Sequence, residues 1–254
     1  MKEAGQLALD HQLEAKLKGK KEDNSEVTTG DLLVHKFLIN KMEKLFPHHQ
    51  IISEEGELKA YDNDRPAVLI DPIDGSYDYL AKGNNWTIMV SIIFKGRPVE
   101  GYIYQPSSFK FYYGNGKESK VEIVDTWYSL DSHCTNESLV GVTSPSTEEE
   151  DLKDFDILGV TEVKKIPTAS SKFLEVISGN ADLYLNHQRK CHIWDLAAPA
   201  VLLEGSGGHL VLPRGFSWDY NKTHLNSIYG AVGGRFKPRL EMVKGLLTEV
   251  KFVK

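Results

Sequence analysis

Helical spacing of apolar residues marks the first part of the chain. Leu7, Leu13 and Leu17, with neighbouring alanines, recur at intervals typical of one helix face. A polar stretch over 19–26 interrupts this pattern, and a second helical pattern covers about 29–45, where Phe46-Pro47 ends it. The sequence therefore predicts two amphipathic helices separated by a polar break.

A different pattern follows, in which short runs are rich in β-branched and aromatic residues. Turn-forming residues separate these runs at 95–98 and at 105–106. Runs of this length with such turns between them are typical of strands joined by tight connections. We expect an antiparallel meander with strands at 67–70, 86–94, 99–104 and 109–113.

The second half of the chain alternates helical and strand-like patterns. Helices are expected at 170–178 and at 195–205, the latter ending at a glycine. The segment 143–156 is acidic and rich in turn formers, so we interpret it as a join. We therefore predict an N-terminal α+β half over 1–140 with an antiparallel sheet, and a C-terminal α/β half over 141–254.

Composition indicates a globular protein that binds a small molecule. The 254 residues are 41% hydrophobic and 26% charged, which is enough apolar material for a large core. The formal net charge of -6 argues against nonspecific binding of a nucleic acid polymer. The densest basic run, Lys16 to Lys21, lies beside acidic residues. A small ligand is the better expectation.

Cysteine usage and hydropathy bear on the cellular compartment. Cys134 and Cys191 are far apart and neither belongs to a CxxC pair, which is typical of a reducing environment. The first residues, Met1 to Lys21, alternate charges, and no apolar run reaches the length of a membrane span. We expect a cytoplasmic protein without a membrane partner.

The segment Asp71-Pro72-Ile73-Asp74-Gly75-Ser76 carries the strongest chemical signal. Proline fixes its own φ, so Asp71 and Asp74 are presented from a stiff turn. Two carboxylates held in this way can bind hard cations beside a phosphate. Taken alone, the segment is equally a turn that caps a helix through Asp74 or Ser76.

Two further acidic sites extend the signal. Glu54 and Glu55 follow the strand-like run 50–52, and Asp195 heads a predicted helix beside Trp194. Trp194-Asp195 alone is equally a buried aromatic next to a helix cap. If the carboxylates at 54–55, 71–74 and 195 converge, they form a set of oxygen ligands that needs no His or Cys. Such a set favours Mg²⁺ over zinc.

Three motifs in this order resemble the signatures of the inositol monophosphatase superfamily. The resemblance implies an α+β fold, a layered αβαβα sandwich of the inositol monophosphatase and fructose-1,6-bisphosphatase type. It also implies that the metals bind where the two halves meet. The motifs are Ser53-Glu54-Glu55, Asp71-Pro72-Ile73-Asp74-Gly75-Ser76 and Trp194-Asp195-Leu196-Ala197-Ala198.

The resemblance also implies a ligand set and a metal. It implies two or three Mg²⁺ ions per site, with Asp71 bridging two of them, and inhibition by Li⁺. The two ions would activate a water molecule and stabilise the leaving alkoxide. The implied metal ligands are Glu54, Asp71, the carbonyl of Ile73, Asp74 and Asp195.

Catalytic roles carry over in the same way. Ser76 takes the place of the family's usual threonine and keeps its hydroxyl. By resemblance, Ser76, Glu54 and Asp31 would orient or deprotonate the attacking water. The backbone N–H groups of Gly75 and Ser76 would bind the phosphate at the start of a short helix. Asp31 is equally explained as an acid favoured in the first turn of a helix.

The substrate depends on the segments around 168–172 and 185–190. Ser170-Ser171-Lys172-Phe173 resembles the motif of the 3'(2'),5'-bisphosphate nucleotidases, although Thr168 stands where that subgroup has glycine. The segment 185–190 lacks the glutamate of inositol-hydrolysing members and carries Arg189 and Lys190. Basic groups suit a second phosphate. Residues expected to bind substrate are Gly75, Ser76, Thr168, Ser170, Lys172, Arg189 and Lys190.

The best functional hypothesis is a 3'(2'),5'-bisphosphate nucleotidase that converts adenosine 3',5'-bisphosphate to AMP. An inositol-1-monophosphatase or a sugar-phosphate phosphatase is the alternative, in which Arg189 and Lys190 belong to a solvated loop. A regulatory protein on an inactive phosphatase scaffold is the non-enzymatic alternative. The expected partner is a small phosphorylated metabolite, and the family resemblance implies a homodimer.

Overall fold

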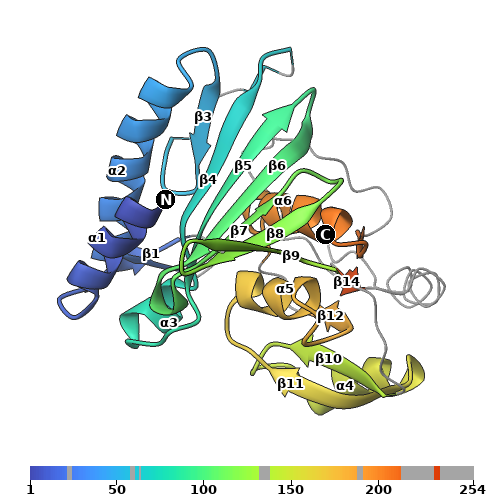
Figure 1. Cartoon of the computed structure of the whole chain (residues 1–254). Coiled ribbons are helices and arrows are strands. Elements are labelled where there is room, and N and C mark those ends of the chain that lie inside the picture. Colours follow the sequence, from blue (N-terminus) through green and yellow to red (C-terminus); the bar gives the residue numbers. More distant parts are fainter. Residues whose placement is uncertain are drawn as a thin grey trace.

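Two β-sheets alternate with three layers of helices (Figure 1). The computed structural model describes residues 1–21, 25–57, 61–62, 64–131, 138–187, 191–212 and 232–234. α1 and α2 cover one face of a seven-stranded sheet, and α5 and α6 lie between this sheet and a five-stranded sheet. α4 packs on the outer side of the second sheet. The αβαβα arrangement expected from the sequence is confirmed.

The first half of the chain supplies the outer helices and the larger sheet. The helices are α1 (Lys2–Gln12), α2 (Thr29–Leu45), α3 (Ser76–Leu80) and the 3-10 helix η1 (Pro106–Ser108). A small hairpin joins β1 (Leu17–Lys20) to β2 (Glu26–Thr28). The large sheet contains β3 (Gln50–Ser53), β4 (Ala67–Asp74), β5 (Thr87–Phe94), β6 (Arg97–Gln105), β7 (Lys110–Gly114), β8 (Ser119–Ile123) and β9 (Thr126–Ser129).

The second half supplies the inner helices and the smaller sheet. The helices are α4 (Glu149–Ile157), α5 (Ala169–Ile177) and α6 (Ile193–Gly205). The strands are β10 (Leu139–Thr143), β11 (Val160–Lys165), β12 (Leu183–Leu185), β13 (His209–Val211) and β14 (Val232–Gly234). Their order in the sheet is β11-β10-β12-β14-β13.

The predicted meander is confirmed in the larger sheet. Neighbouring strands from β4 to β9 pair antiparallel in chain order, and β3 pairs parallel to β4 at one edge. The turn between β5 and β6 uses Lys95 and Gly96, with φ of 50° and 70°. Positive φ at both central residues matches the right-handed twist of the flanking strands, so this turn closes the hairpin tightly.

α2 begins where local chemistry predicts it. The Thr28 side chain accepts hydrogen bonds from the N–H groups of Gly30 and Asp31, and the Thr28 N–H donates to Asp31 Oδ2 over 2.7 Å. This reciprocal capping box satisfies backbone donors that the first turn leaves free. Val34 and Leu38 then pack on the sheet. The cap also fixes the side chain of Asp31 in a buried position.

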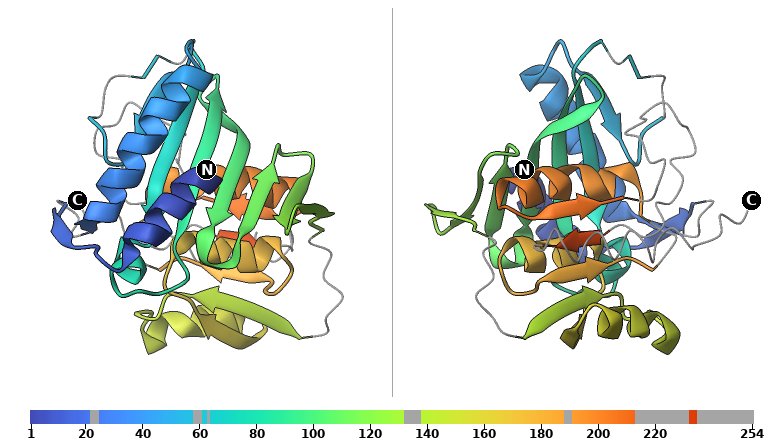
Figure 2. Two further views of the ribbon diagram at one scale, coloured as in Figure 1. Left: turned by 60° about the vertical axis from the view of Figure 1, so that its left-hand side comes forward. Right: turned by 90° about the vertical axis from the view of Figure 1, so that its right-hand side faces the viewer.

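α6 is the central element of the core. Its side chains are buried nearly all round, because it packs on β5, β6 and β7 on one side and on the smaller sheet on the other. Figure 2 shows it on the face of the large sheet opposite α1 and α2. A Cβ on Gly101 of β6 would lie 2.6 Å from the Ala198 carbonyl oxygen of α6. This close contact lets the middle of α6 pack directly on the middle of β6.

Two of the local expectations were wrong. The first helix ends at Gln12, and Leu17 belongs to β1, where it is exposed, because the chain pairs with β2 instead of extending the helix. The supposed join at 143–156 contains the end of β10 and the helix α4. Phe155 of this helix is fully buried, and its acidic first turn is favourable at a helix N-terminus.

The two sheets are built from residues 50–129 and 139–234. The proposed division near residue 140 stays a prediction, since α6 of the second half packs directly on the sheet of the first. Cys191 is buried and free, and Cys134 lies outside the described residues. No helix in the described ranges is long and apolar enough to cross a membrane.

Candidate metal-dependent active site

Three aspartates meet where β4 ends and α6 begins. Asp71, Asp74 and Asp195 are all buried, and a carboxylate oxygen of each lies within 4.8 Å of the others. Residues three apart on a regular strand would face opposite sides of the sheet. In β4, however, Asp71 lies opposite Met89 and Asp74 opposite Thr87, so one extra residue forms a bulge. The bulge turns both carboxylates to the same side.

The carboxylate oxygens of this cluster suit a hard cation. Neither oxygen of Asp71 has a hydrogen-bond partner within the described residues, although both are buried. Burial raises the pKa of Asp71, and the charges of Glu54, Asp74 and Asp195 raise it further. Burial and Asp74 likewise raise the pKa of Asp195. Unpaired buried carboxylates are costly, and an ion such as Mg²⁺ would offset this cost. The residues present therefore fit the metal.

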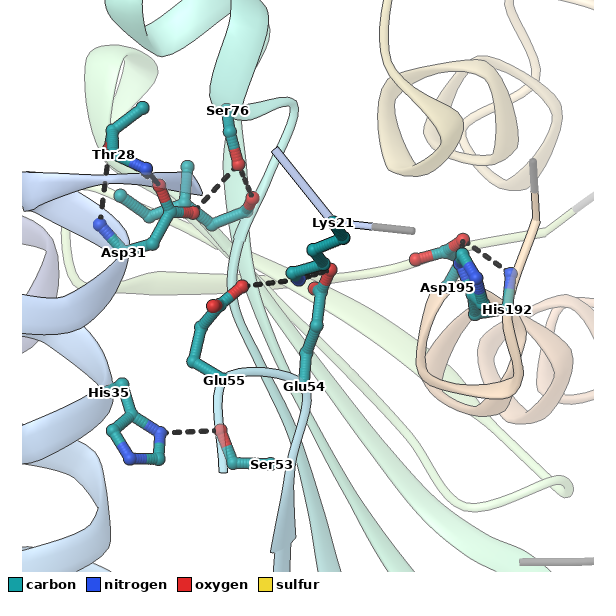
Figure 3. A network of polar contacts seen from close by, with 11 residues as sticks. Lys21, Thr28, Asp31, His35, Ser53, Glu54, Glu55, Ser76, His192 and Asp195 are labelled. Carbon is teal, nitrogen blue, oxygen red and sulfur yellow. Dashed lines mark hydrogen bonds and ion pairs between the residues drawn. The ribbon is translucent and has the colours of Figure 1, made fainter. Parts of the chain in front are cut away.

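Glu54 lies close enough to this cluster for its charge to act on Asp71, and it is paired with a lysine that was not among the predicted site residues. Lys21 Nζ lies 2.5 Å from Glu54 Oε1 and 2.5 Å from Glu55 Oε1 (Figure 3). Burial by itself lowers the pKa of Lys21, but the two carboxylates raise it above its usual value. Lys21 is therefore a fixed cation beside a predicted metal ligand. In the sequence, this residue ends the basic run Lys16 to Lys21.

The end of β3, which carries Glu54, is anchored to α2. His35 Nδ1 and Ser53 Oγ lie 2.8 Å apart (Figure 3), and Ser53 is buried. The backbone N–H of Glu54 donates to the Ile70 carbonyl over 3.0 Å. These contacts hold the glutamate beside the aspartates on β4.

Ser76 and Asp31, which are predicted to orient the attacking water, are in direct contact. Ser76 Oγ donates to Asp31 Oδ1 over 2.7 Å and lies 3.3 Å from the Ile73 carbonyl oxygen (Figure 3). Asp31 Oδ2 is occupied by Thr28. Burial raises the pKa of Asp31, while the hydrogen bonds from Thr28 and Ser76 lower it. Because Ser76 donates its proton to Asp31, its oxygen remains able to accept one from water.

Asp195 is oriented by its own helix. It lies in the first turn of α6, and the N–H of His192 donates to Asp195 Oδ2 over 2.6 Å (Figure 3). The imidazole of His192 stacks on Trp194, with ring centroids 5.1 Å apart. The interpretation of Trp194-Asp195 as a buried aromatic beside a cap therefore holds at this helix end. The role of Asp195 as a metal ligand stays a prediction.

Gly75 and Thr168 are in direct contact. Gly75 has φ of 92°, and a Cβ there would lie 2.4 Å from Thr168 Cγ2. Thr168 is the N-cap of α5 and its hydroxyl donates to the Asn85 carbonyl over 2.8 Å. The methyl group of Thr168 therefore covers the backbone of Gly75. The bisphosphate nucleotidase motif has glycine in place of Thr168. Thr168 is only 3% exposed and packs against Gly75.

Lys172 is buried on α5. Its Nζ donates to Ser144 Oγ over 2.5 Å and lies 5.2 Å from the centroid of the Tyr184 ring. No carboxylate among the described residues forms an ion pair with it. Burial lowers the pKa of Lys172 to about 8, although Asp74 opposes this shift. Ser144 carried no signal in the sequence. Arg189 and Lys190 lie outside the described residues.

Several known proteins with similar sequence or structure are phosphatases. The chain is 26% identical over 203 residues to the 3'(2'),5'-bisphosphate nucleotidase CysQ of Salmonella typhimurium, covering 79% of this chain and 82% of that protein. It is 25% identical over 211 residues to the inositol-1-monophosphatase of Bacillus subtilis, covering 81% and 79%. A staphylococcal inositol monophosphatase, solved as a lithium-soaked inhibitory complex, superimposes with a TM-score of 0.78 at 17% identity, covering 98% of this chain and 91% of that one.

The family assignment rests on the length of the match together with the site. The model of the inositol monophosphatase family matches residues 1–240, which include every described residue of the acidic cluster. The order of the motifs and the convergence of Asp71, Asp74 and Asp195 agree with that match. The chain belongs to the inositol monophosphatase family and is a phosphoric monoester hydrolase.

Proposed function

We propose that this protein is a Mg²⁺-dependent phosphatase that hydrolyses a 3'(2'),5'-bisphosphate nucleotide, with adenosine 3',5'-bisphosphate converted to AMP. The observation that carries this proposal is Lys172, a buried cation without a carboxylate partner in the described part of the chain. It lies close enough to Asp74 and Asp195 for their charges to act on it. The likeness to CysQ supports the same substrate class.

The metal would be held by Glu54, Asp71, Asp74, Asp195 and the carbonyl of Ile73. Bound Mg²⁺ would supply Lewis-acid stabilisation of phosphate charge and would lower the pKa of water. Lys21 competes for Glu54 before metal is bound, because its Nζ already occupies one oxygen of that carboxylate. The Li⁺ inhibition named for the staphylococcal structure is proposed for this chain as well.

The protein's own groups would orient the water and the phosphate. Ser76 would accept a hydrogen bond from the attacking water while it donates to Asp31, which fixes the direction of the oxygen lone pairs. The N–H groups of Gly75 and Ser76 would bind phosphate oxygens, and the φ of 92° at Gly75 is a conformation that glycine adopts readily. Water attacks directly, and no covalent phosphoenzyme forms.

Lys172 would bind the second phosphate of the substrate. A protonated lysine that donates to an anion contributes about 1.5–3 kcal/mol, or roughly 10- to 150-fold in binding. We expect Lys172→Met to lower kcat/KM for adenosine 3',5'-bisphosphate by about that factor, and to leave kcat/KM for a monophosphate ester nearly unchanged. Steady-state kinetics with both substrates measure the difference. Lys164→Met, a change at a half-exposed lysine on β11, is the matched control. An equal loss for both substrates would contradict recognition of the second phosphate.

The experiment that tests the proposal is phosphate release with Mg²⁺, comparing adenosine 3',5'-bisphosphate with inositol 1-phosphate at equal concentration. A preference for the nucleotide supports the assignment. A preference for inositol phosphate would favour the alternative, an inositol monophosphatase, which the likeness to the Bacillus subtilis enzyme supports. No release from either, together with no Mg²⁺ binding, would point to an inactive scaffold. The roles of Thr168, Arg189 and Lys190, a homodimer and a cytoplasmic location stay predictions.

A further inference from the structure

Ser170 contacts a predicted metal ligand from the other half of the chain. Both of its donors reach the same atom: the Ser170 N–H donates to Asp74 Oδ2 over 2.8 Å, and the Ser170 hydroxyl donates to that oxygen as well. Ser170 is completely buried. Its hydroxyl is therefore used inside the protein, at the carboxylate that lies between β4 and α5.

A second hydroxyl fixes the direction of the first. Thr87 Oγ1 donates to Ser170 Oγ over 2.8 Å, and Thr87 is itself completely buried. Thr87 lies directly opposite Asp74 in the pairing of β4 with β5. Since Ser170 Oγ accepts this proton, its own proton is directed at Asp74. The hydroxyls of Thr87 and Ser170 therefore hold the Asp74 carboxylate in one orientation.

The hydroxyl of Ser170 is not needed to cap its helix. Thr168 is the N-cap of α5, and its side chain accepts from the Ser171 N–H. Thr168 and Ser171 also donate to the Asn85 carbonyl, which ties the start of α5 to the loop before β5. Thr168 and Ser171 thus stabilise the start of α5, and the hydroxyl proton of Ser170 is left to bond Asp74.

We propose that Ser170 is a positioning residue that makes Asp74 a one-oxygen metal ligand. With two donors on Oδ2, that oxygen is occupied, and Oδ1 is the oxygen left for a metal ion. One carboxylate oxygen of Asp74 lies within 4.8 Å of one from Asp71 and one from Asp195. Hydrogen bonds to a ligating carboxylate commonly change metal affinity by about 10- to 100-fold. The inference rests on the proposed function, because it takes Asp74 to be a metal ligand.

Metal affinity of Ser170→Ala tests the role directly. We expect Mn²⁺, measured by electron paramagnetic resonance, and Mg²⁺, measured by calorimetry, to bind about tenfold more weakly than to the wild type. The Mg²⁺ concentration for half-maximal hydrolysis should rise by the same factor, while kcat at saturating Mg²⁺ is largely restored. A loss of folded protein alone would lower kcat without moving the metal dependence.

Two variants separate positioning from packing. Ser171→Ala removes a buried hydroxyl from the next residue, one that bonds Asn85 instead of Asp74, and should leave metal affinity within about twofold. Ser170→Thr keeps the hydroxyl and should recover most of the affinity. Unchanged metal affinity in Ser170→Ala overturns the inference and leaves the proposed function standing. A wild-type protein that binds neither metal overturns both.

Discussion

Asp71→Asn should abolish most turnover and stabilise the metal-free protein. Asp71 is a predicted metal ligand, and its loss would remove negative charge that would hold the metal ion, so we expect kcat/KM to fall by about 10³-fold. The same change removes an ionisable group whose oxygens have no hydrogen-bond donor in the described structure. The free energy of unfolding without metal should therefore rise by about 1–2 kcal/mol.

The stabilisation expected for Asp71→Asn should increase with pH. Burial raises the pKa of Asp71 in the folded state above its ordinary value of 3.8. The native state then holds the proton more tightly than the unfolded chain, so the free energy of unfolding falls as pH rises above that ordinary value. The asparagine variant lacks this contribution. Denaturant unfolding in the presence of a chelator, at pH 5 and at pH 8, should show the larger gain at pH 8.

A buried acid elsewhere gives the control. Asp182 is also buried, but its Oδ2 accepts the N–H of Val140 over 2.9 Å. Asp182→Asn should leave the kinetics unchanged and should not stabilise the protein. The metal-site interpretation fails if Asp71→Asn keeps wild-type activity at saturating Mg²⁺, or if it destabilises the metal-free protein as much as an ordinary core change.

Ser76→Ala should lower kcat by about 10²- to 10³-fold, because the water loses the acceptor that connects it to Asp31. Mg²⁺ affinity should change little, since the aspartate cluster is intact. Ser76→Thr is the matched variant: it keeps the hydroxyl, and Ser76 is only partly buried, so an added methyl has space. We expect its kcat to stay within a few-fold of the wild type, because the hydroxyl remains.

The measurement is steady-state hydrolysis at saturating Mg²⁺, with Mg²⁺ affinity determined separately by calorimetry. If Ser76→Ala and Ser76→Thr lose the same activity, the hydroxyl has no part in binding water. If Ser76→Ala weakens metal binding strongly, Ser76 acts by holding the Ile73 carbonyl, which lies 3.3 Å from its oxygen.

Local patterns in the sequence determined the elements and the chemical type of the site. The capping of α2 by Thr28 and Asp31 and the strands of the meander follow from interactions between near neighbours in the chain, which periodicity and turn residues record. The ordered acidic motifs also identified Asp71, Asp74 and Asp195, which converge in the structure, through their resemblance to the family signatures.

Only the tertiary structure decided how these residues are held. The pairing of Lys21 with Glu54, the two donors of Ser170 on Asp74 and the burial of Lys172 each join segments far apart in the chain. The bulge in β4 and the helix α4 likewise depend on the surfaces against which they pack. Contacts of this kind arise only when segments distant in the chain pack together, and no spacing within one segment records that packing.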